Sequence, residues 1–254
     1  MLIERYDDYE QLSLKVAELV KSQILNRPES VLGLATGSTP LGLYDHLIVM
    51  HKSGEIDFSG VKTFNLDEYC GLSNDHPQSY YQFMQRHLFQ HVNLKSENTH
   101  MPPPPIEGNF MDCQAYDNLI LQNNGIDLQV LGIGRNGHIG FNEPGTSFSS
   151  RTHVVQLHEQ TRTANARFFS SVDEVPKEAV TMGIKTIMRA KKILLIISGQ
   201  SKQQAVYQLV FSPVDEKFPA SVLQLHPDVT VLADRMATAT LEQACAFTHN
   251  VLNI

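Results

Sequence analysis

The segment of residues 127–147 holds several side chains that could transfer protons, set in a glycine-rich loop. It begins with an apolar run from residue 128 to 133, which is typical of a strand buried on both faces. The glycines at positions 132, 134, 137 and 140 would let the following backbone turn sharply and lie against a ligand. Asn136, His138 and Glu143 stand in this loop. We interpret it as a catalytic loop at the carboxyl end of a strand; the alternative is a surface turn with an incidental histidine.

A second motif, Thr36-Gly37-Ser38-Thr39-Pro40, directly follows the apolar run 30–35. Thr39 suits the N-cap position and Pro40 the first helical position, which predicts a helix over residues 40–50. The free backbone N–H groups at a helix start, together with the hydroxyls and the flexible Gly37, form a candidate anion site. A capped helix without a ligand is the alternative. The motif is not a Walker loop, because no GK[ST] follows.

Two further polar groups follow predicted buried strands. Asp67 and Glu68 come after the strand at 61–66, and Lys202 ends the segment that follows the strand at 192–198. Adjacent residues on extended backbone point to opposite faces, so one of the two acids can face a pocket while the other caps or pairs. A solvated acidic turn is the alternative for this pair.

The predicted elements alternate between strands and helices along the chain. We expect strands at 30–35, 61–66, 128–133, 151–157, 192–198 and 229–233, and helices at 8–25, 40–50, 79–92, 110–122, 176–190 and 202–211. This order favours an α/β fold with an open, mostly parallel sheet covered by helices on both faces. A length of 254 residues fits one such domain, residues 1–254.

In open sheets of this class, ligands bind outside the carboxyl ends of the strands. Each of the four polar groups follows a strand at that end, so we expect them to share one pocket. The pocket would hold a phosphate near residues 36–39 and Lys202, with carboxylates and a histidine beside it. Such a set favours proton transfer on a sugar phosphate.

Composition and charge restrict the possible partners. The formal net charge is −7 and the chain has no block of Lys and Arg, which speaks against nucleic acid and anionic membranes. The N-terminus lacks the pattern of a signal peptide, and the longest aliphatic run is too short to span a bilayer. Cysteines stand at positions 70, 113 and 245 without a CxxC motif, so we expect a reducing compartment, the cytoplasm.

A metal site is not expected. His87 and His91 have the spacing of two metal ligands on one helix. However, Leu88 stands where zinc proteases of that type carry glutamate, and no third ligand is evident.

Five blocks in order along residues 30–235 resemble the glucosamine-6-phosphate deaminase (isomerase) family: LGLATGSTPLGLY, FNLDEYCGL, GIGRNGHIGFNEPGTSF, RTANARFF and SGQSK. The resemblance implies a modified Rossmann-type fold. It also implies conversion of glucosamine 6-phosphate and water to fructose 6-phosphate and ammonia, without an organic cofactor. The segment at about 150–185 would be a mobile lid over the pocket.

The resemblance also assigns roles to particular residues. Asp67 would move a proton between C2 and C1 of the open-chain sugar, and His138, assisted by Glu143, would open the pyranose ring. The phosphate would be bound by the loop of Thr36, Gly37, Ser38 and Thr39 together with Arg167 and Lys202. Many relatives have aspartate where this chain has Asn136. An amide can orient the imidazole but cannot stabilise its cation, so ring opening would depend more on Glu143.

The resemblance also bears on regulation and on the oligomeric state. Long allosteric relatives carry basic residues after an SRT motif, whereas His153-Val154-Val155-Gln156 follow Arg151-Thr152 here. We therefore expect no activation by an N-acetylated sugar phosphate. The chain could be a monomer or a homo-oligomer.

Two rival functions remain at this point. A 6-phosphogluconolactonase-like hydrolase would share the fold and the phosphate loop, but it needs no carbon base such as Asp67. A non-catalytic sugar-phosphate sensor would usually carry a basic DNA-binding region, which this sequence lacks.

Overall fold

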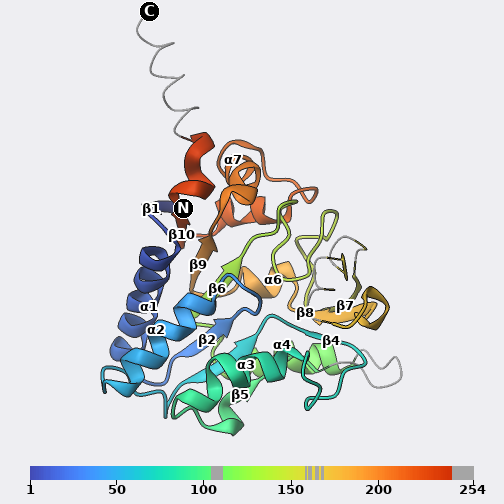
Figure 1. Ribbon diagram of the computed structural model, residues 1–254. Coiled ribbons are helices and arrows are strands. Elements are labelled where there is room, and N and C mark those ends of the chain that lie inside the picture. Colours follow the sequence, from blue (N-terminus) through green and yellow to red (C-terminus); the bar gives the residue numbers. More distant parts are fainter. Residues whose placement is uncertain (104–110, 158, 160–161, 164–165, 167–168, 242–254) are drawn as a thin grey trace, which may run out of the picture.

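The computed structural model describes residues 1–103, 111–157, 159, 162–163, 166 and 169–241 (Figure 1). Within these residues, the main sheet has seven strands in the order β1-β10-β9-β6-β2-β3-β5, and each neighbouring pair is parallel. Its strands are β1 (Leu2–Tyr6), β2 (Val31–Leu34), β3 (Lys62–Asn65), β5 (Thr99–His100), β6 (Leu128–Gly132), β9 (Lys192–Ile197) and β10 (Val229–Asp234). The expected open, parallel α/β sheet is confirmed.

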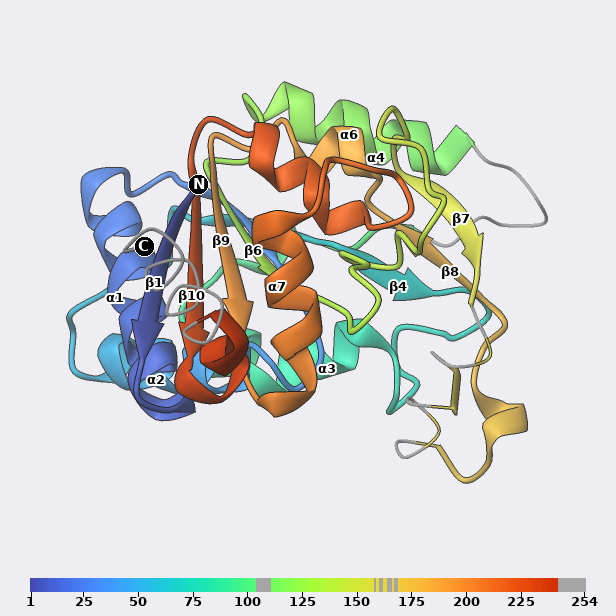
Figure 2. The same ribbon diagram turned by 90° about the horizontal axis from the view of Figure 1, so that it is seen from above.

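Helices cover both faces of this sheet, as Figure 2 shows from above. One apolar core lies under α1 (Tyr9–Asn26), α2 (Leu41–Lys52) and α3 (Tyr80–His87). The other lies under α4 (Met111–Gln122), α6 (Ile184–Ile187) and α7 (Gln203–Phe211). Short 3-10 turns occur at η1 (Phe89–His91), η2 (Ser96–Asn98), η4 (Val172–Glu174), η5 (Gln200–Lys202) and η6 (Pro219–Leu225). Among the described helices, none has the length and apolar character needed to cross a bilayer.

A second, antiparallel sheet stands beside the carboxyl edge of the first. Within the described residues its order is β4-β8-β7, formed by β4 (Asp67–Tyr69), β8 (Glu178–Thr181) and β7 (His153–Gln156). Thr181 of the central strand lies opposite Asp67 on one side and opposite His153 on the other. This sheet therefore fixes the residues that follow β3.

The helix predicted over residues 176–190 is wrong in its first part. That segment forms strand β8, and only Ile184–Ile187 is helical. The apolar side chains of this segment fit a helical period, but pairing with β4 and β7 and complete burial of Ala179, Val180 and Thr181 stabilise the strand instead.

Several other boundaries differ from the prediction. Strands β1 and β5 were not expected; both lie at edges of the sheet and lack a continuous buried run. The helix expected over 79–92 ends at His87 and is followed by a 3-10 turn. Helix α1 is close to its expected range and begins after Asp8, whose carboxylate accepts from the Gln11 N–H as an N-cap.

At the amino edge of the sheet, Asp127 joins three segments. Its carboxylate, 3% exposed, lies 2.7 Å from both Arg27 Nη1 and Lys191 Nζ. It also accepts the Val31 N–H at 2.8 Å, while the Asp127 N–H donates to the Val31 carbonyl. The carboxylate thus holds the starts of β2 and β6 in register.

We predict that Asp127→Ala lowers the free energy of unfolding by about 2–4 kcal/mol, because a buried N–H and two cations lose their partner. Lys191→Met is the control. It removes one half-exposed cation and is expected to cost less than about 1 kcal/mol. Urea unfolding of the two variants measures the difference, and equal losses would contradict the account.

Candidate active site

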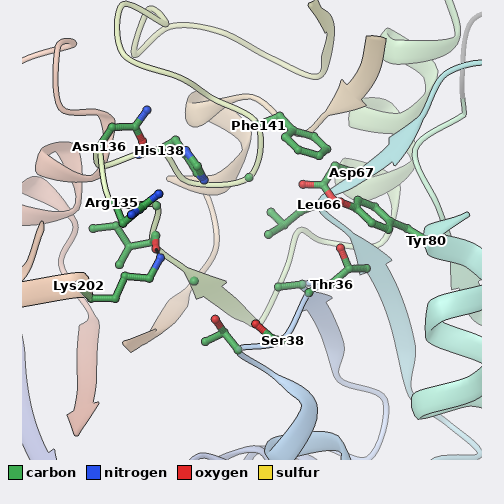
Figure 3. Close-up of a pocket in the computed structure, with 17 residues that line it drawn as sticks. Thr36, Ser38, Leu66, Asp67, Tyr80, Arg135, Asn136, His138, Phe141 and Lys202 are labelled. Carbon is green, nitrogen blue, oxygen red and sulfur yellow. Dashed lines mark hydrogen bonds between the residues drawn. The ribbon is translucent and has the colours of Figure 1, made fainter. Parts of the chain in front are cut away.

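A pocket of about 340 Å³ opens at the carboxyl edge of the main sheet. The four polar groups singled out in the sequence come together there, and Figure 3 shows Asp67, His138, Lys202 and Thr36 around one space. The predicted site residues that line it are Thr36, Gly37, Ser38, Thr39, Asp67, Asn136, His138 and Lys202. Glu143 lies behind this lining and contacts two of its members. Arg167 is outside the described residues.

The loop of residues 36–39 forms the floor of the pocket after β2. Gly37 has φ +91°, and a Cβ added there would meet nothing within 4 Å, so the backbone is open to a ligand. The predicted N-cap is wrong: α2 begins at Leu41, Pro40 stands at the cap position, and no side chain of the cap residue bonds the helix. The Thr39 hydroxyl is therefore not used for capping.

Asp67 reaches the pocket from β4 and is 6% exposed. Burial raises the pKa of its carboxyl to about 8, and the charge of Glu68 adds to the effect. A hydrogen bond with the Thr36 hydroxyl acts in the opposite direction. A carboxyl group with such a pKa can both accept and return a proton near neutral pH.

Glu68 has a different partner set on the opposite face of β4. Its carboxylate accepts the backbone N–H groups of Tyr69, Tyr80 and Tyr81 at 2.8, 2.9 and 2.8 Å, and so holds the start of α3. The expectation that one acid of the pair faces the pocket while the other caps is confirmed. The arrangement also brings the Tyr80 side chain against the pocket, a residue that sequence reasoning missed.

The loop after β6 folds so that Glu143 lies between two other predicted residues, Asn136 and His138. Asn136 Nδ2 donates to Glu143 Oε2 at 2.7 Å, and His138 Nδ1 lies 3.4 Å from Glu143 Oε1, within ion-pair range but without hydrogen-bond alignment. A Cβ at Gly134 would lie 2.4 Å from the His138 ring. The glycine thus makes room for the imidazole. A carboxylate beside Nδ1 favours a proton there, which leaves Nε2 to accept one from a ligand.

Two hydrogen bonds connect the loop after β6 with β8 and the residue that follows β8. The Phe141 N–H donates to Thr181 Oγ1 at 3.1 Å, and Asn142 Nδ2 donates to the Met182 carbonyl at 2.9 Å. Met182 in turn donates its N–H to the Leu66 carbonyl at 2.6 Å. Strand β8 and the residue after it therefore link this loop to Leu66, directly before Asp67.

Lys202 enters the pocket from the turn after β9. Its Nζ donates to the Ile133 carbonyl at 2.6 Å, and burial followed by the nearby Arg135 lowers its pKa. Asp234, at the end of β10, accepts the Gly199 N–H at 2.9 Å and so orders the turn that leads to Lys202. Arg135 also lines the pocket and adds a second cation, which sequence reasoning missed although Arg135 directly precedes Asn136.

The lid expected at about 150–185 stays a prediction. Its last residues belong to β8 and α6, where Thr181 and Ile184 are buried. Part of the segment between β7 and β8 lies outside the described residues, so closure over the pocket stays a prediction. Within the described residues, no group of three His, Cys, Asp or Glu side chains is arranged to hold a metal ion.

The fold and the pocket define an α/β protein with a candidate anion-binding loop beside acid–base groups. Residues 7–232 match the sequence profile of the family of glucosamine-6-phosphate isomerases/6-phosphogluconolactonase. The chain belongs to this family.

Relatives with high identity cover nearly the whole chain. The glucosamine-6-phosphate deaminase of Thermoanaerobacter pseudethanolicus is 55% identical over 234 residues, covering 92% of each chain. That of Clostridium novyi is 51% identical over 241 residues, covering 95% of this chain and 100% of its own.

Solved structures agree with this family assignment. A monomeric glucosamine-6-phosphate deaminase has a TM-score of 0.92 at 51% identity, covering 94% of this chain and 99% of its own. The 6-phosphogluconolactonase of Leishmania guyanensis has a TM-score of 0.72 at 21% identity, covering 93% of this chain and 97% of its own. The second likeness concerns the fold alone.

The raised pKa of Asp67 predicts a pH-dependent stability. The carboxyl stays protonated in the folded state up to about pH 8, whereas it ionises near pH 4 in the unfolded state. Its stabilising contribution is therefore complete below about pH 4 and is lost as the pH rises toward 8. Asp67→Asn does not titrate, so its stability relative to the wild type should grow over this range, by at most about 1.4 kcal/mol per pH unit.

Unfolding midpoints measured between pH 4 and pH 9 test this expectation. Asp228→Asn, at an exposed position, is the control and should run parallel to the wild type. A constant difference between Asp67→Asn and the wild type across the range would contradict the assigned pKa shift.

Proposed function

We propose that this protein is a glucosamine-6-phosphate deaminase, which converts glucosamine 6-phosphate and water to fructose 6-phosphate and ammonia. The observation that carries the proposal is the pocket itself. An open phosphate loop and Lys202 lie at one part of it, and Asp67 and His138 at another. Relatives of this name match more than nine-tenths of the chain at 51–55% identity.

The phosphate site is formed by the 36–39 loop and Lys202. Backbone N–H groups near the start of α2 and the hydroxyls of Ser38 and Thr39 supply donors for phosphate oxygens. The Lys202 ammonium supplies charge, and Arg135 strengthens the positive field. Arg167 is assigned to the same phosphate by family resemblance. Binding of this remote group positions C1 and C2 at the acid–base groups.

Ring opening is assigned to His138 with Glu143. The imidazole accepts the proton of the C1 hydroxyl and returns a proton to the ring oxygen as the C1–O5 bond breaks. Glu143, 3.4 Å from His138 Nδ1, stabilises the imidazolium that forms between the two steps. Asn136, which donates to Glu143, orients that carboxylate and carries no charge of its own.

Asp67 is assigned to the carbon proton transfer. Its carboxylate removes the proton from C2 of the open-chain aldehyde while a proton of the substrate ammonium group passes to the C1 oxygen, which gives an enolamine. The carboxylic acid of Asp67 then protonates C1. The product is an imine at C2. Water adds to this carbon, and ammonia leaves to give the ketose. Burial makes Asp67 a stronger base, because a poorly hydrated carboxylate binds a proton more tightly.

The rival lactonase function has no comparable support. Lactone hydrolysis needs no carbon base, so it gives no reason for a buried carboxyl with a raised pKa at Asp67. The 6-phosphogluconolactonases among the structural neighbours share the fold at 17–21% identity. A non-catalytic sensor likewise gives no reason for a carboxylate, Glu143, beside the His138 imidazole.

We propose a cytoplasmic location, where free cysteines stay reduced. Cys70 fits this assignment, because burial raises the pKa of its thiol to about 12 and keeps it unreactive. The described site residues lie together in the pocket of a single chain. The proposed reaction is therefore open to a monomer and to a homo-oligomer.

The direct test incubates the purified protein with glucosamine 6-phosphate and measures ammonia and fructose 6-phosphate together. We expect equal amounts of both from the wild type. Asp67→Asn should lower kcat by at least about 10³-fold, since it removes the carbon base, while substrate still binds. Wild-type-like turnover in that variant would remove Asp67 from its role, and hydrolysis of a phosphogluconolactone without ammonia release would favour the rival.

Rates should follow a hyperbolic dependence on glucosamine 6-phosphate, with or without N-acetylglucosamine 6-phosphate. The reason is that His153-Val154-Val155-Gln156 lacks the basic residues of the allosteric relatives. Initial rates at several concentrations of each compound test this point. A sigmoidal curve that becomes hyperbolic on adding the N-acetylated compound would show that an activator site exists.

A further inference from the structure

Tyr9, the first residue of α1, lies behind the phosphate loop and contacts it through its hydroxyl. The oxygen accepts the Gly42 N–H at 2.8 Å. The hydroxyl proton is shared between two acceptors, the Thr39 carbonyl at 2.9 Å and the Ser38 carbonyl at 3.2 Å. One hydroxyl therefore joins both ends of the turn between the loop and α2.

These contacts replace the N-cap that the sequence predicts at Thr39. Gly42 is the second residue of α2, and its N–H is one that an N-cap side chain ordinarily satisfies. The cap residue is Pro40, which offers no such side chain. A side chain from another helix thus caps α2 across a separation of 33 residues.

Capping from outside leaves the donors of the loop available. Within the described part of the chain, the backbone N–H groups of Gly37, Ser38 and Thr39 have no hydrogen-bond partner, and neither do the hydroxyls of Ser38 and Thr39. The Ser38 and Thr39 carbonyls, which would repel an anion, are instead bound by Tyr9 on the side of α1. Both effects favour an anion in the pocket.

We propose that Tyr9 is the positioning residue of the phosphate site, which caps α2 in place of Thr39 and holds the loop carbonyls away from the bound anion. The inference rests on the phosphate-binding role proposed for this loop. Tyr9 does not line the pocket and contacts no reacting atom, so its effect is expected on binding and not on the chemical step.

Tyr9→Phe removes the hydroxyl and keeps the ring. We expect the KM for glucosamine 6-phosphate and the dissociation constant for inorganic phosphate each to rise about tenfold, as for the loss of a helix cap. The kcat should stay within about twofold of the wild type. The Gly42 amide should also exchange its hydrogen faster, which hydrogen–deuterium exchange of the peptide covering residues 37–43 reports.

Tyr207→Phe is the matched control, because Tyr207 is half-exposed on α7 and packs on Phe211 away from the loop. It should leave both binding constants unchanged. The proposal is overturned if Tyr9→Phe binds inorganic phosphate and substrate as the wild type does. It is also overturned if Tyr9→Phe lowers kcat at an unchanged KM.

The same measurements distinguish a failure of the proposed deaminase function from a failure of the role proposed for Tyr9. If the wild type binds inorganic phosphate but releases no ammonia, the proposed function fails. The dissociation constant for inorganic phosphate of Tyr9→Phe, relative to that of the wild type, still decides the role of Tyr9. If the wild type binds neither inorganic phosphate nor glucosamine 6-phosphate, both proposals fall.

Discussion

The pairing of β4 with β8 is the constraint on which the site depends. Asp67 stands on a strand of only three residues, too short to be rigid alone. Its position is fixed because Thr181 lies opposite in the antiparallel ladder and because the Met182 N–H donates to the Leu66 carbonyl. The same two residues, Thr181 and Met182, also bind the loop after β6 at Phe141 and Asn142. Strand β8 and the residue after it thus hold Asp67 and the loop that carries His138 in one arrangement.

Burial of the titratable groups in the pocket disfavours their charged forms and so lowers the stability of the free protein. Burial makes the Asp67 carboxylate and the Lys202 ammonium harder to charge, as the raised pKa of one and the lowered pKa of the other show. A ligand that brings a charge of opposite sign stabilises the ionised form of each group. A dianionic phosphate beside Lys202 and an amino group near Asp67 would do so, which makes the free protein less stable than its complex.

Much of the arrangement could be predicted from the sequence, because it follows from local patterns. Buried apolar runs ending in Thr36, Asp67 and Gly134 indicated parallel strands, and parallel strands must place their carboxyl ends at one edge. The opposite orientations of Asp67 and Glu68 followed from strand geometry in the same way.

The features that sequence reasoning missed depend on contacts between distant segments. Strand β8 has an apolar spacing that also fits a helix, and only its pairing with β4 and β7 decides the outcome. Thr39 has the right type and place for an N-cap, but the hydroxyl of Tyr9 already occupies the Gly42 N–H. Arg135 faces the pocket because of the turn at Gly134 and Gly137, which the residue types alone do not orient.

A crystal structure of the protein with fructose 6-phosphate would show whether one pocket holds both the phosphate and the reacting carbons. We expect phosphate oxygens within hydrogen-bond distance of the 36–39 backbone N–H groups and Lys202 Nζ. We also expect an Asp67 carboxylate oxygen within about 3.5 Å of C1 or C2 of the same sugar. A phosphate bound away from that loop, or a sugar whose C1 and C2 lie beyond reach of Asp67, would contradict the account.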